Sequence, residues 1–147
     1  MGTEERKRIL IVEDEDKLAK LLADQLALAG YETHAEAYGL VALRYAAEYQ
    51  PDLVILDLRL PDIPGYEVCR ELRKLYHFWV MPILMLTAMD KPMDQLRGFA
   101  YGADGYITKP FTLPEVLETV SQLLGPISPA QPFTPEIPDQ FLRFSDR

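Results

Sequence analysis

The chain has 147 residues, of which 48% are hydrophobic and 26% are charged, a composition typical of one globular domain. Its formal net charge of -8 at pH 7 argues against direct contact with nucleic acid or with an anionic membrane. Cys69 is the only cysteine, which excludes a disulfide framework and a metal site built from cysteines.

The N-terminal residues show no targeting signal. Residues 4–8 are charged and lead directly into an apolar segment, so the apolar core of a signal peptide is missing. No apolar run in the sequence approaches the ~20 residues that a membrane-spanning helix needs. We therefore expect a cytoplasmic protein that makes no contact with membranes.

Short apolar segments alternate with amphipathic segments along most of the chain. Strand-like composition is found, in chain order, at 9–12, 31–37, 53–57, 82–87 and 105–108. Helical periodicity is found at 18–29, 40–49, 68–75, 93–101 and 116–124. Five strand–helix repeats predict an α/β domain, in which a parallel sheet with right-handed crossovers carries helices on both faces.

Two of these elements are weaker than the others. Segment 31–37 is polar enough to be an edge strand. Helix 93–101 follows Pro92 and contains Gly98, and a glycine costs roughly 1 kcal/mol relative to Ala inside a helix. We therefore expect the helix to be the most mobile of the structured elements.

Three of the predicted strands end in charged residues. The first is followed by Glu13 and Asp14, the third ends in Asp57, and the fifth leads to Lys109. Open α/β sheets bind ligands at the carboxyl edge of their strands, where these side chains would meet. Crowded carboxylates need a hard cation, and an adjacent lysine needs an anion. The pattern predicts a site for Mg²⁺ and a phosphoryl group, with Asp57 as the acceptor.

An ordered set of motifs connects this pattern with a known family. The motifs are Glu13-Asp14, Asp57, Pro61 and Gly65 in the next loop, Thr87-Ala88, Gly102-Ala103-Asp104 and Lys109-Pro110-Phe111. Through them, residues 8–124 resemble the receiver domain of bacterial two-component response regulators. The resemblance implies a flavodoxin-like, three-layer (βα)5 fold with sheet order 2-1-3-4-5. It also implies that a sensor histidine kinase or phosphotransfer protein donates a phosphoryl group from a phosphohistidine.

The resemblance assigns roles to the acidic residues. Asp57 is the phosphoacceptor, whose carboxylate attacks phosphorus in line. Asp14 binds Mg²⁺ directly and Glu13 binds it through water, although Asp is more common at the Glu13 position. Asp57 itself and the backbone carbonyl of Arg59 complete the implied metal ligands.

The resemblance also assigns roles to three residues around the acceptor. Lys109 pairs with Asp57 at rest and with a phosphoryl oxygen afterwards, and the peptide before Pro110 is cis. Thr87 hydrogen-bonds the phosphoryl group when it moves inward. Tyr106 is either the switch ring that enters the vacated space or an ordinary half-buried strand tyrosine. The face of the fourth helix, fifth strand and fifth helix then controls an output domain, which we expect to be transcriptional.

Three other functions compete with this switch, which turns over no substrate beyond its own phosphorylation and dephosphorylation. A haloacid-dehalogenase-type phosphohydrolase also uses a strand-end Asp and Mg²⁺, but it requires a second Asp where Arg59 stands. A flavodoxin-like FMN carrier requires a hydroxyl- and glycine-rich loop, whereas residues 13–16 are all acidic. A degenerate receiver that serves only as a protein-binding module would lack some of the five core site residues, all of which are present.

Residues 6–125 form the predicted receiver domain, and the composition changes after it. Prolines recur at every third residue from 126 to 138, which favours an extended polyproline II linker over 126–140. Residues 141–147 resemble the start of an OmpR-like winged-helix DNA-binding domain and are either the stub of that missing output domain or a disordered tail. The apolar run 76–80 is either a contact patch or folds back over the third helix.

A homodimer is expected to be weak or absent. In the OmpR-like subfamily, receivers pair through the fourth helix, fifth strand and fifth helix, with ion pairs that set the register. Arg97, Asp104 and Glu115 match that pattern. However, Gly105 stands where a second Asp is usual, and the stretch 110–142 contains no Lys or Arg. Most of the ion pairs therefore cannot form between two copies.

Overall fold

A computed structural model of the chain describes residues 6–75 and 81–125. The predictions made for residues 76–80, 126–140 and 141–147 lie outside the described residues. Within the two described ranges, no helix is long and apolar enough to cross a membrane.

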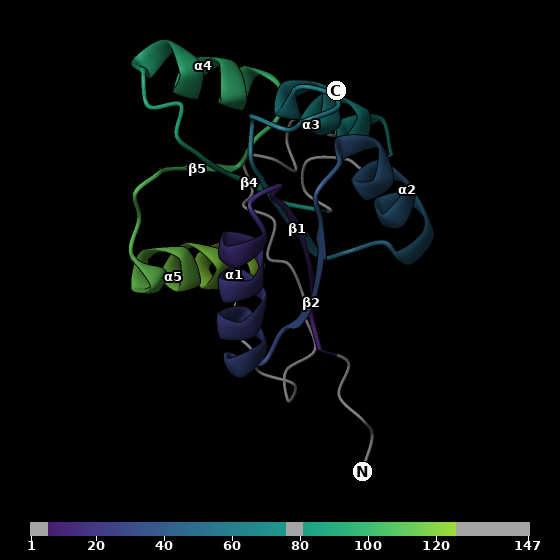
Figure 1. The fold of residues 1–147 in the computed structure, drawn as a ribbon, viewed down its shortest axis with the longest axis vertical. Coiled ribbons are helices and arrows are strands. Elements are labelled where there is room, and N and C mark those ends of the chain that lie inside the picture. Colours follow the sequence, from purple (N-terminus) through teal and green to yellow (C-terminus); the bar gives the residue numbers. More distant parts are fainter. Residues whose placement is uncertain (1–5, 76–80, 126–147) are drawn as a thin grey trace, which may run out of the picture.

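The sheet has the predicted topology. Its strands are β1 (Arg8–Val12), β2 (Glu32–Glu36), β3 (Leu53–Leu56), β4 (Ile83–Thr87) and β5 (Gly105–Thr108). Neighbouring strands in the described part of the chain all run parallel, in the order β2-β1-β3-β4-β5 (Figure 1). This confirms the flavodoxin-like order, with the polar strand β2 at one edge. Because all strands are parallel, their carboxyl ends meet at one edge of the sheet.

Helices cover both faces of the sheet. In the described residues they are α1 (Asp16–Leu28), α2 (Gly39–Tyr49), α3 (Gly65–Leu75), α4 (Pro92–Ala100) and α5 (Leu113–Leu124). Strand residues alternate between the faces, so Ile9 and Ile11 pack under α1 and α5, whereas Leu10 and Val12 pack under α2 and α3. Figure 1 shows the resulting layers, with α1 and α5 on one side and α2 and α3 on the other.

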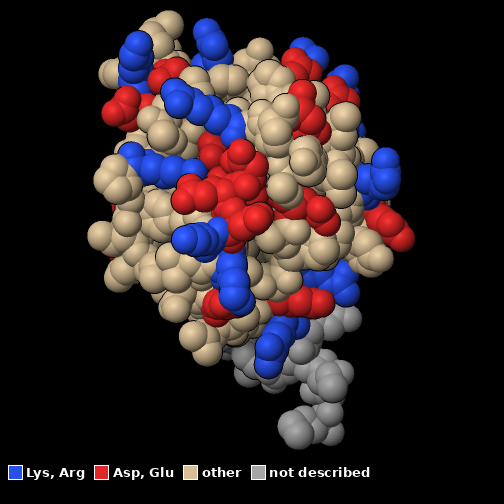
Figure 2. Space-filling view, in the orientation of Figure 1, with Lys and Arg blue, Asp and Glu red and all other residues tan. Residues whose placement is uncertain are grey.

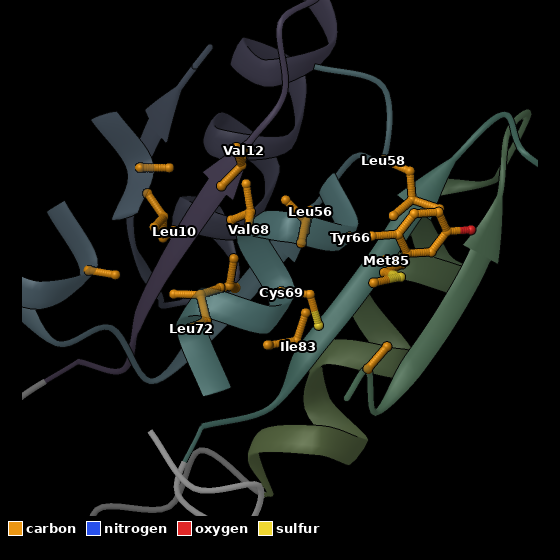
Figure 3. Packing of buried hydrophobic residues seen from close by; sticks show 14 of the residues in the cluster. Leu10, Val12, Leu56, Leu58, Tyr66, Val68, Cys69, Leu72, Ile83 and Met85 are labelled. Atoms are coloured by element: carbon orange, nitrogen blue, oxygen red, sulfur yellow. The ribbon is translucent and has the colours of Figure 1, made fainter. Parts of the chain in front are cut away.

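The cluster under α2 and α3 is the one that reaches the switch elements. We call it the α3-side core; it includes Val68, Cys69 and Leu72 from α3 and Met85 from β4 (Figure 3). Tyr106 of β5 packs against the same cluster from its margin. The hydrophobic core therefore extends from α3 to the strand that precedes Lys109.

Some helix positions differ from the sequence prediction. The helical periodicity of 68–75 places Leu75 on one apolar stripe with Val68 and Leu72, but Leu75 is 50% exposed because α3 ends at this residue. Leu21 of α1 is 42% exposed, whereas Leu22 beside it is buried. Helix α4 begins at Pro92 itself. Proline is tolerated there because the N–H of the first helical residue makes no hydrogen bond within the helix.

Gly65 allows α3 to begin directly beside the end of β3. Its N–H donates to the carbonyl of Leu58 at 2.8 Å. A Cβ at residue 65 would lie 2.4 Å from the carbonyl oxygen of Asp57 and 2.5 Å from the Cα of Leu58. Both neighbours are backbone atoms that cannot turn aside, so this close approach requires glycine.

We therefore predict that Gly65→Ala lowers the free energy of unfolding by at least about 2 kcal/mol, measured by urea denaturation. The matched control is Gly105→Ala, because the nearest atom to a Cβ there would be the terminal Leu84 Cδ1, at 3.0 Å, and that side chain can move. The control should cost less than about 1 kcal/mol. Equal losses for the two variants would contradict the close-approach argument.

Candidate functional site

The charged residues that follow β1 and β3 lie together at the carboxyl edge of the sheet. Glu13 and Asp57 are buried, with 4% and 6% of their surface exposed, whereas Asp14 is exposed. Figure 2 shows acidic side chains gathered near the centre of the viewed face, at the N-terminal end of α1 in Figure 1. Buried carboxylates are costly unless a positive charge lies beside them.

Lys109, which follows β5, supplies that positive charge. Its Nζ lies 2.7 Å from Oε1 of Glu13 and 2.9 Å from Oδ2 of Asp57. The peptide between Lys109 and Pro110 is cis. The sequence analysis predicts the contact with Asp57 but not the shorter one with Glu13, which it assigned to the metal alone. One ammonium group therefore joins the ends of β1, β3 and β5.

Burial and pairing act in opposite directions on these charges. Burial raises the pKa of Glu13 above its usual 4.5, and the hydrogen bond from Lys109 offsets this only in part. Burial alone lowers the pKa of Lys109, but its hydrogen bonds to Glu13 and Asp57 outweigh burial and raise it above 10.5. The stability that Lys109 contributes is therefore complete below pH 10.5 and is lost as the pH rises through its higher folded value.

Backbone N–H groups hold the remaining oxygens of the two buried carboxylates. The N–H of Arg59 donates to Oδ1 of Asp57 at 3.1 Å, and the N–H of Glu15 donates to Oε2 of Glu13 at 3.1 Å. Each carboxylate thus has one oxygen on Lys109 and the other on the loop that follows its own strand. Both side chains are oriented before any ligand arrives.

A third carboxylate completes an oxygen-rich cluster. Ligand atoms of Glu13, Asp14 and Asp57 all lie within 4.8 Å of one another. Mg²⁺ prefers oxygen ligands and takes one or two carboxylates together with several waters, so this donor set fits the ion. Arg59 lies at the site through its N–H, and its carbonyl as a further metal ligand stays a prediction.

Thr87 and Tyr106 are linked through the peptide groups of Met89. Thr87 is fully buried at the end of β4, and its Oγ1 accepts a hydrogen bond from the N–H of Met89 at 3.4 Å. The hydroxyl of half-buried Tyr106 donates to the carbonyl of Met89 at 2.7 Å. Burial raises the pKa of Tyr106 well above its usual 10.0, so this hydroxyl stays a donor. The two predicted switch residues therefore share one residue in the loop before α4.

Asp62, whose role the sequence pattern does not indicate, connects the loop after β3 to α2. Its carboxylate accepts hydrogen bonds from the N–H groups of Gly39 at 2.8 Å and Leu40 at 2.9 Å. Burial slightly opposes ionisation, but these bonds outweigh it and lower the pKa of Asp62. An N-cap that comes from a distant segment leaves no local signal in the sequence.

Arg73, in the last turn of α3, also has a role that the sequence pattern does not indicate. Its guanidinium donates to the carbonyls of Met81 and Gly102 at 2.6 Å each, and to the carboxylate of Asp104 at 2.7 Å. Its side chain is only 9% exposed. A basic residue at a helix end usually faces solvent, so the sequence alone gives no reason to expect this clamp on the turn before β5.

Comparisons with known proteins agree with this geometry. The family model described as "Response regulator receiver domain" matches residues 9–121. The chain is 41% identical, over 117 residues, to the DNA-binding dual master transcriptional regulator RpaA from Synechocystis sp.. The matched region covers 80% of this chain and 48% of RpaA. The chain is 42% identical, over 118 residues, to the alkaline phosphatase synthesis transcriptional regulatory protein PhoP from Bacillus subtilis, with the same coverage of each chain.

A solved structure gives the same result for the fold. The response regulator receiver domain protein (CheY-like) from Methanospirillum hungatei superposes with a TM-score of 0.77 at 29% identity, covering 82% of this chain and 94% of that one. The chain thus belongs to the response regulator receiver family, and residues 9–121 are its receiver domain. The phosphohydrolase alternative is not favoured. The chain spans about half the length of the two transcriptional regulators to which it is similar.

We predict that Lys109→Met lowers the free energy of unfolding by about 3 kcal/mol in EDTA, because it leaves two buried carboxylates without a cation. Added Mg²⁺ should recover part of this loss. The control is Lys20→Met, which breaks an exposed pair with Asp24 at 3.2 Å and should cost less than about 0.5 kcal/mol. Urea denaturation with and without Mg²⁺ measures both. A Lys109→Met chain as stable in EDTA as the control would contradict the proposed pairing.

Proposed function

We propose that Asp57 accepts a phosphoryl group from a phosphohistidine and that the other site residues serve this transfer. The observation that carries the proposal is the buried Asp57 carboxylate, held by the Arg59 N–H and the Lys109 ammonium at the carboxyl edge of the sheet. A carboxylate that is shielded from water, held in one orientation and placed beside a cation is suited to form an acyl phosphate. A structural strand-end carboxylate would not require the second buried acid, Glu13.

The transfer balances as a displacement at phosphorus. One oxygen of Asp57 attacks the phosphorus, the bond from phosphorus to the imidazole nitrogen breaks, and its electron pair remains on the imidazole. Glu13, Asp14 and Asp57 would hold Mg²⁺, which supplies positive charge to the phosphoryl oxygens when it is bound. Lys109 moves its contact from the Asp57 carboxylate to a phosphoryl oxygen.

We further propose that Thr87 and Tyr106 report the phosphorylated state. When Thr87 turns its hydroxyl to the phosphoryl group, its hydrogen bond with the N–H of Met89 changes. The carbonyl of Met89 holds the Tyr106 hydroxyl, so the change reaches β5 and the start of α4. Two arrangements that differ by a few kcal/mol are enough for such a switch.

The partners follow from this function. We propose a sensor histidine kinase or phosphotransfer protein as the donor, and a transcriptional output domain as the part controlled, since both relatives are transcriptional regulators and RpaA is described as DNA-binding. The receiver would act in the cytoplasm and turn over no other substrate. A receiver used only as a protein-binding module is the remaining alternative, and a chain that is never phosphorylated would favour it.

Acetyl phosphate with Mg²⁺ should add one phosphoryl group to the chain, measured as intact mass. Asp57→Asn and EDTA should each abolish the addition. Asp62→Asn is the matched control, because it changes an exposed aspartate of the same loop and should leave the addition intact. A wild-type chain that stays unmodified under these conditions would contradict the proposal.

The structure adds a reason to expect weak dimerisation. Asp104 is bound by Arg73 of its own chain, and its Oδ2 also accepts the N–H of Ile83 at 2.9 Å. The guanidinium of Arg97 lies 5.5 Å from the ring centre of Tyr66. Two of the three residues that match the dimer pattern thus have partners within the chain.

Sedimentation with Mg²⁺ and the phosphate mimic beryllofluoride should therefore show a monomer or a weak dimer. Arg73→Met removes the guanidinium partner of Asp104 and leaves its carboxylate with the N–H of Ile83, so this variant should dimerise more readily than the wild type. A tight wild-type dimer that buries α4 and α5 would refute the expectation.

A further inference from the structure

Helix α4 is held by few side chains. Among its nine residues, all of which the structure describes, Gly98 is the only buried one. A Cβ at residue 98 would lie 2.8 Å from Sδ of Met85 and 3.0 Å from the Tyr106 ring, so strand side chains pack directly on the backbone of the helix. The side of α4 that faces α3 has a different partner, which is Tyr66.

Tyr66 contacts α4 at three successive levels. Its hydroxyl donates to the backbone carbonyl of Asp94 at 3.2 Å, in the first turn. The guanidinium of Arg97 lies over its ring at 5.5 Å, and the ring of Tyr101 packs at 5.2 Å between centres. Residues 94, 97 and 101 share one face of a helix. One side chain from α3 therefore contacts the first turn of α4, its middle and the C-cap residue that follows it.

Tyr66 is also close in the chain to the acceptor. It follows Gly65, whose N–H is bound to the carbonyl of Leu58 and whose Cα lies against the backbone of Asp57. Figure 3 shows the Tyr66 ring beside Leu58 and Met85, with its hydroxyl directed away from the rest of the α3-side core. A shift of the backbone after Asp57 therefore moves Gly65 and with it the Tyr66 side chain.

We propose that Tyr66 is a second positioning residue for α4, which connects the state of Asp57 to this helix by a route separate from Thr87 and Tyr106. The inference rests on the proposed phosphorylation of Asp57. The two routes pass through different hydrogen bonds, although Tyr66 belongs to the α3-side core and Tyr106 packs against it. One passes through Gly65 and Tyr66 to the side of α4 that faces α3, and the other passes through Met89 to its start and its β5 side.

The chemistry of the phenol supports this role. Burial raises the pKa of Tyr66 above its usual 10.0, so the hydroxyl is protonated and donates. The Asp94 carbonyl has a second lone pair and can accept this bond while it remains in the helix. A phenylalanine at the position would keep the contacts of the ring with Arg97 and Tyr101 but lose the bond to Asp94. Tyr66→Phe therefore isolates the hydroxyl.

Hydrogen exchange of the α4 amides tests the proposal, in wild type, in Tyr66→Phe and in the control Tyr45→Phe. Tyr45 lies on α2, and its ring stacks on His34 with 3.9 Å between the ring centres. Removing its hydroxyl should therefore leave the exchange of α4 unchanged. Without ligand, Tyr66→Phe should raise α4 exchange about fivefold, the effect of one lost hydrogen bond, while β3 exchange stays as in wild type. With Mg²⁺ and beryllofluoride, the ligand-induced change in α4 should be smaller by about twofold or more.

Either of two results would overturn the role of Tyr66: α4 exchange equal to wild type without ligand, or a ligand-induced change of the wild-type size. The separateness of the routes is tested with Tyr106→Phe and the double variant. Independent routes require that the fold-changes of the single variants multiply in the double variant. A double variant no different from Tyr106→Phe alone would show one shared route.

Intact mass after acetyl phosphate and Mg²⁺ separates this inference from the function on which it rests. A wild-type chain without an added phosphoryl group contradicts the acceptor role of Asp57. A phosphorylated chain whose α4 responds equally in wild type and in Tyr66→Phe contradicts only the role of Tyr66.

Discussion

Two carboxylates buried at one sheet edge, Glu13 and Asp57, are the constraint on which this structure depends. Burial raises the pKa of Glu13, and the nearby carboxylate of Asp57 adds to this rise. Lys109 compensates both, which ties the ends of β1, β3 and β5 to one ammonium group. A divalent cation or a phosphoryl group changes the charge balance of this trio. Ligand binding is therefore coupled to the positions of three strand ends.

The same edge determines what can move. The backbone at Asp57 packs closely against Gly65, and the Arg59 N–H holds its carboxylate, so a change at Asp57 is passed on to the start of α3. Helix α4, by contrast, exposes Met93, Leu96 and Phe99 and buries only Gly98. The turn between α4 and β5 is held by Arg73, whose guanidinium donates a hydrogen bond to the carbonyl of Gly102. A helix attached firmly at one end and lightly along its length is suited to shift when the edge changes charge.

The alternation of strands and helices, the strand-end charges and the edge position of β2 could be read from the sequence, because they follow from local composition. The sheet order was implied only by the resemblance to the receiver family, because strand composition does not say which strands are neighbours. The contact of Lys109 with Glu13 could not be read from the sequence, since the sequence does not fix which carboxylate a flexible lysine meets. Asp62, Tyr66 and Arg73 each act on a segment far away in the chain, so their roles leave no local pattern. Gly98 reads as a weakness of its helix, yet the structure gives it a reason in the close approach of Tyr106.

The most direct test of the central claim is ¹⁹F NMR of the metal-replete chain with beryllofluoride. We expect protein-bound fluoride resonances that require Mg²⁺, that are absent in Asp57→Asn, and that shift in Lys109→Met because the ammonium group contacts the bound ion. Bound resonances that persist in Asp57→Asn, or none at all in the wild type, would contradict the assignment of Glu13, Asp57 and Lys109 as the phosphoacceptor site.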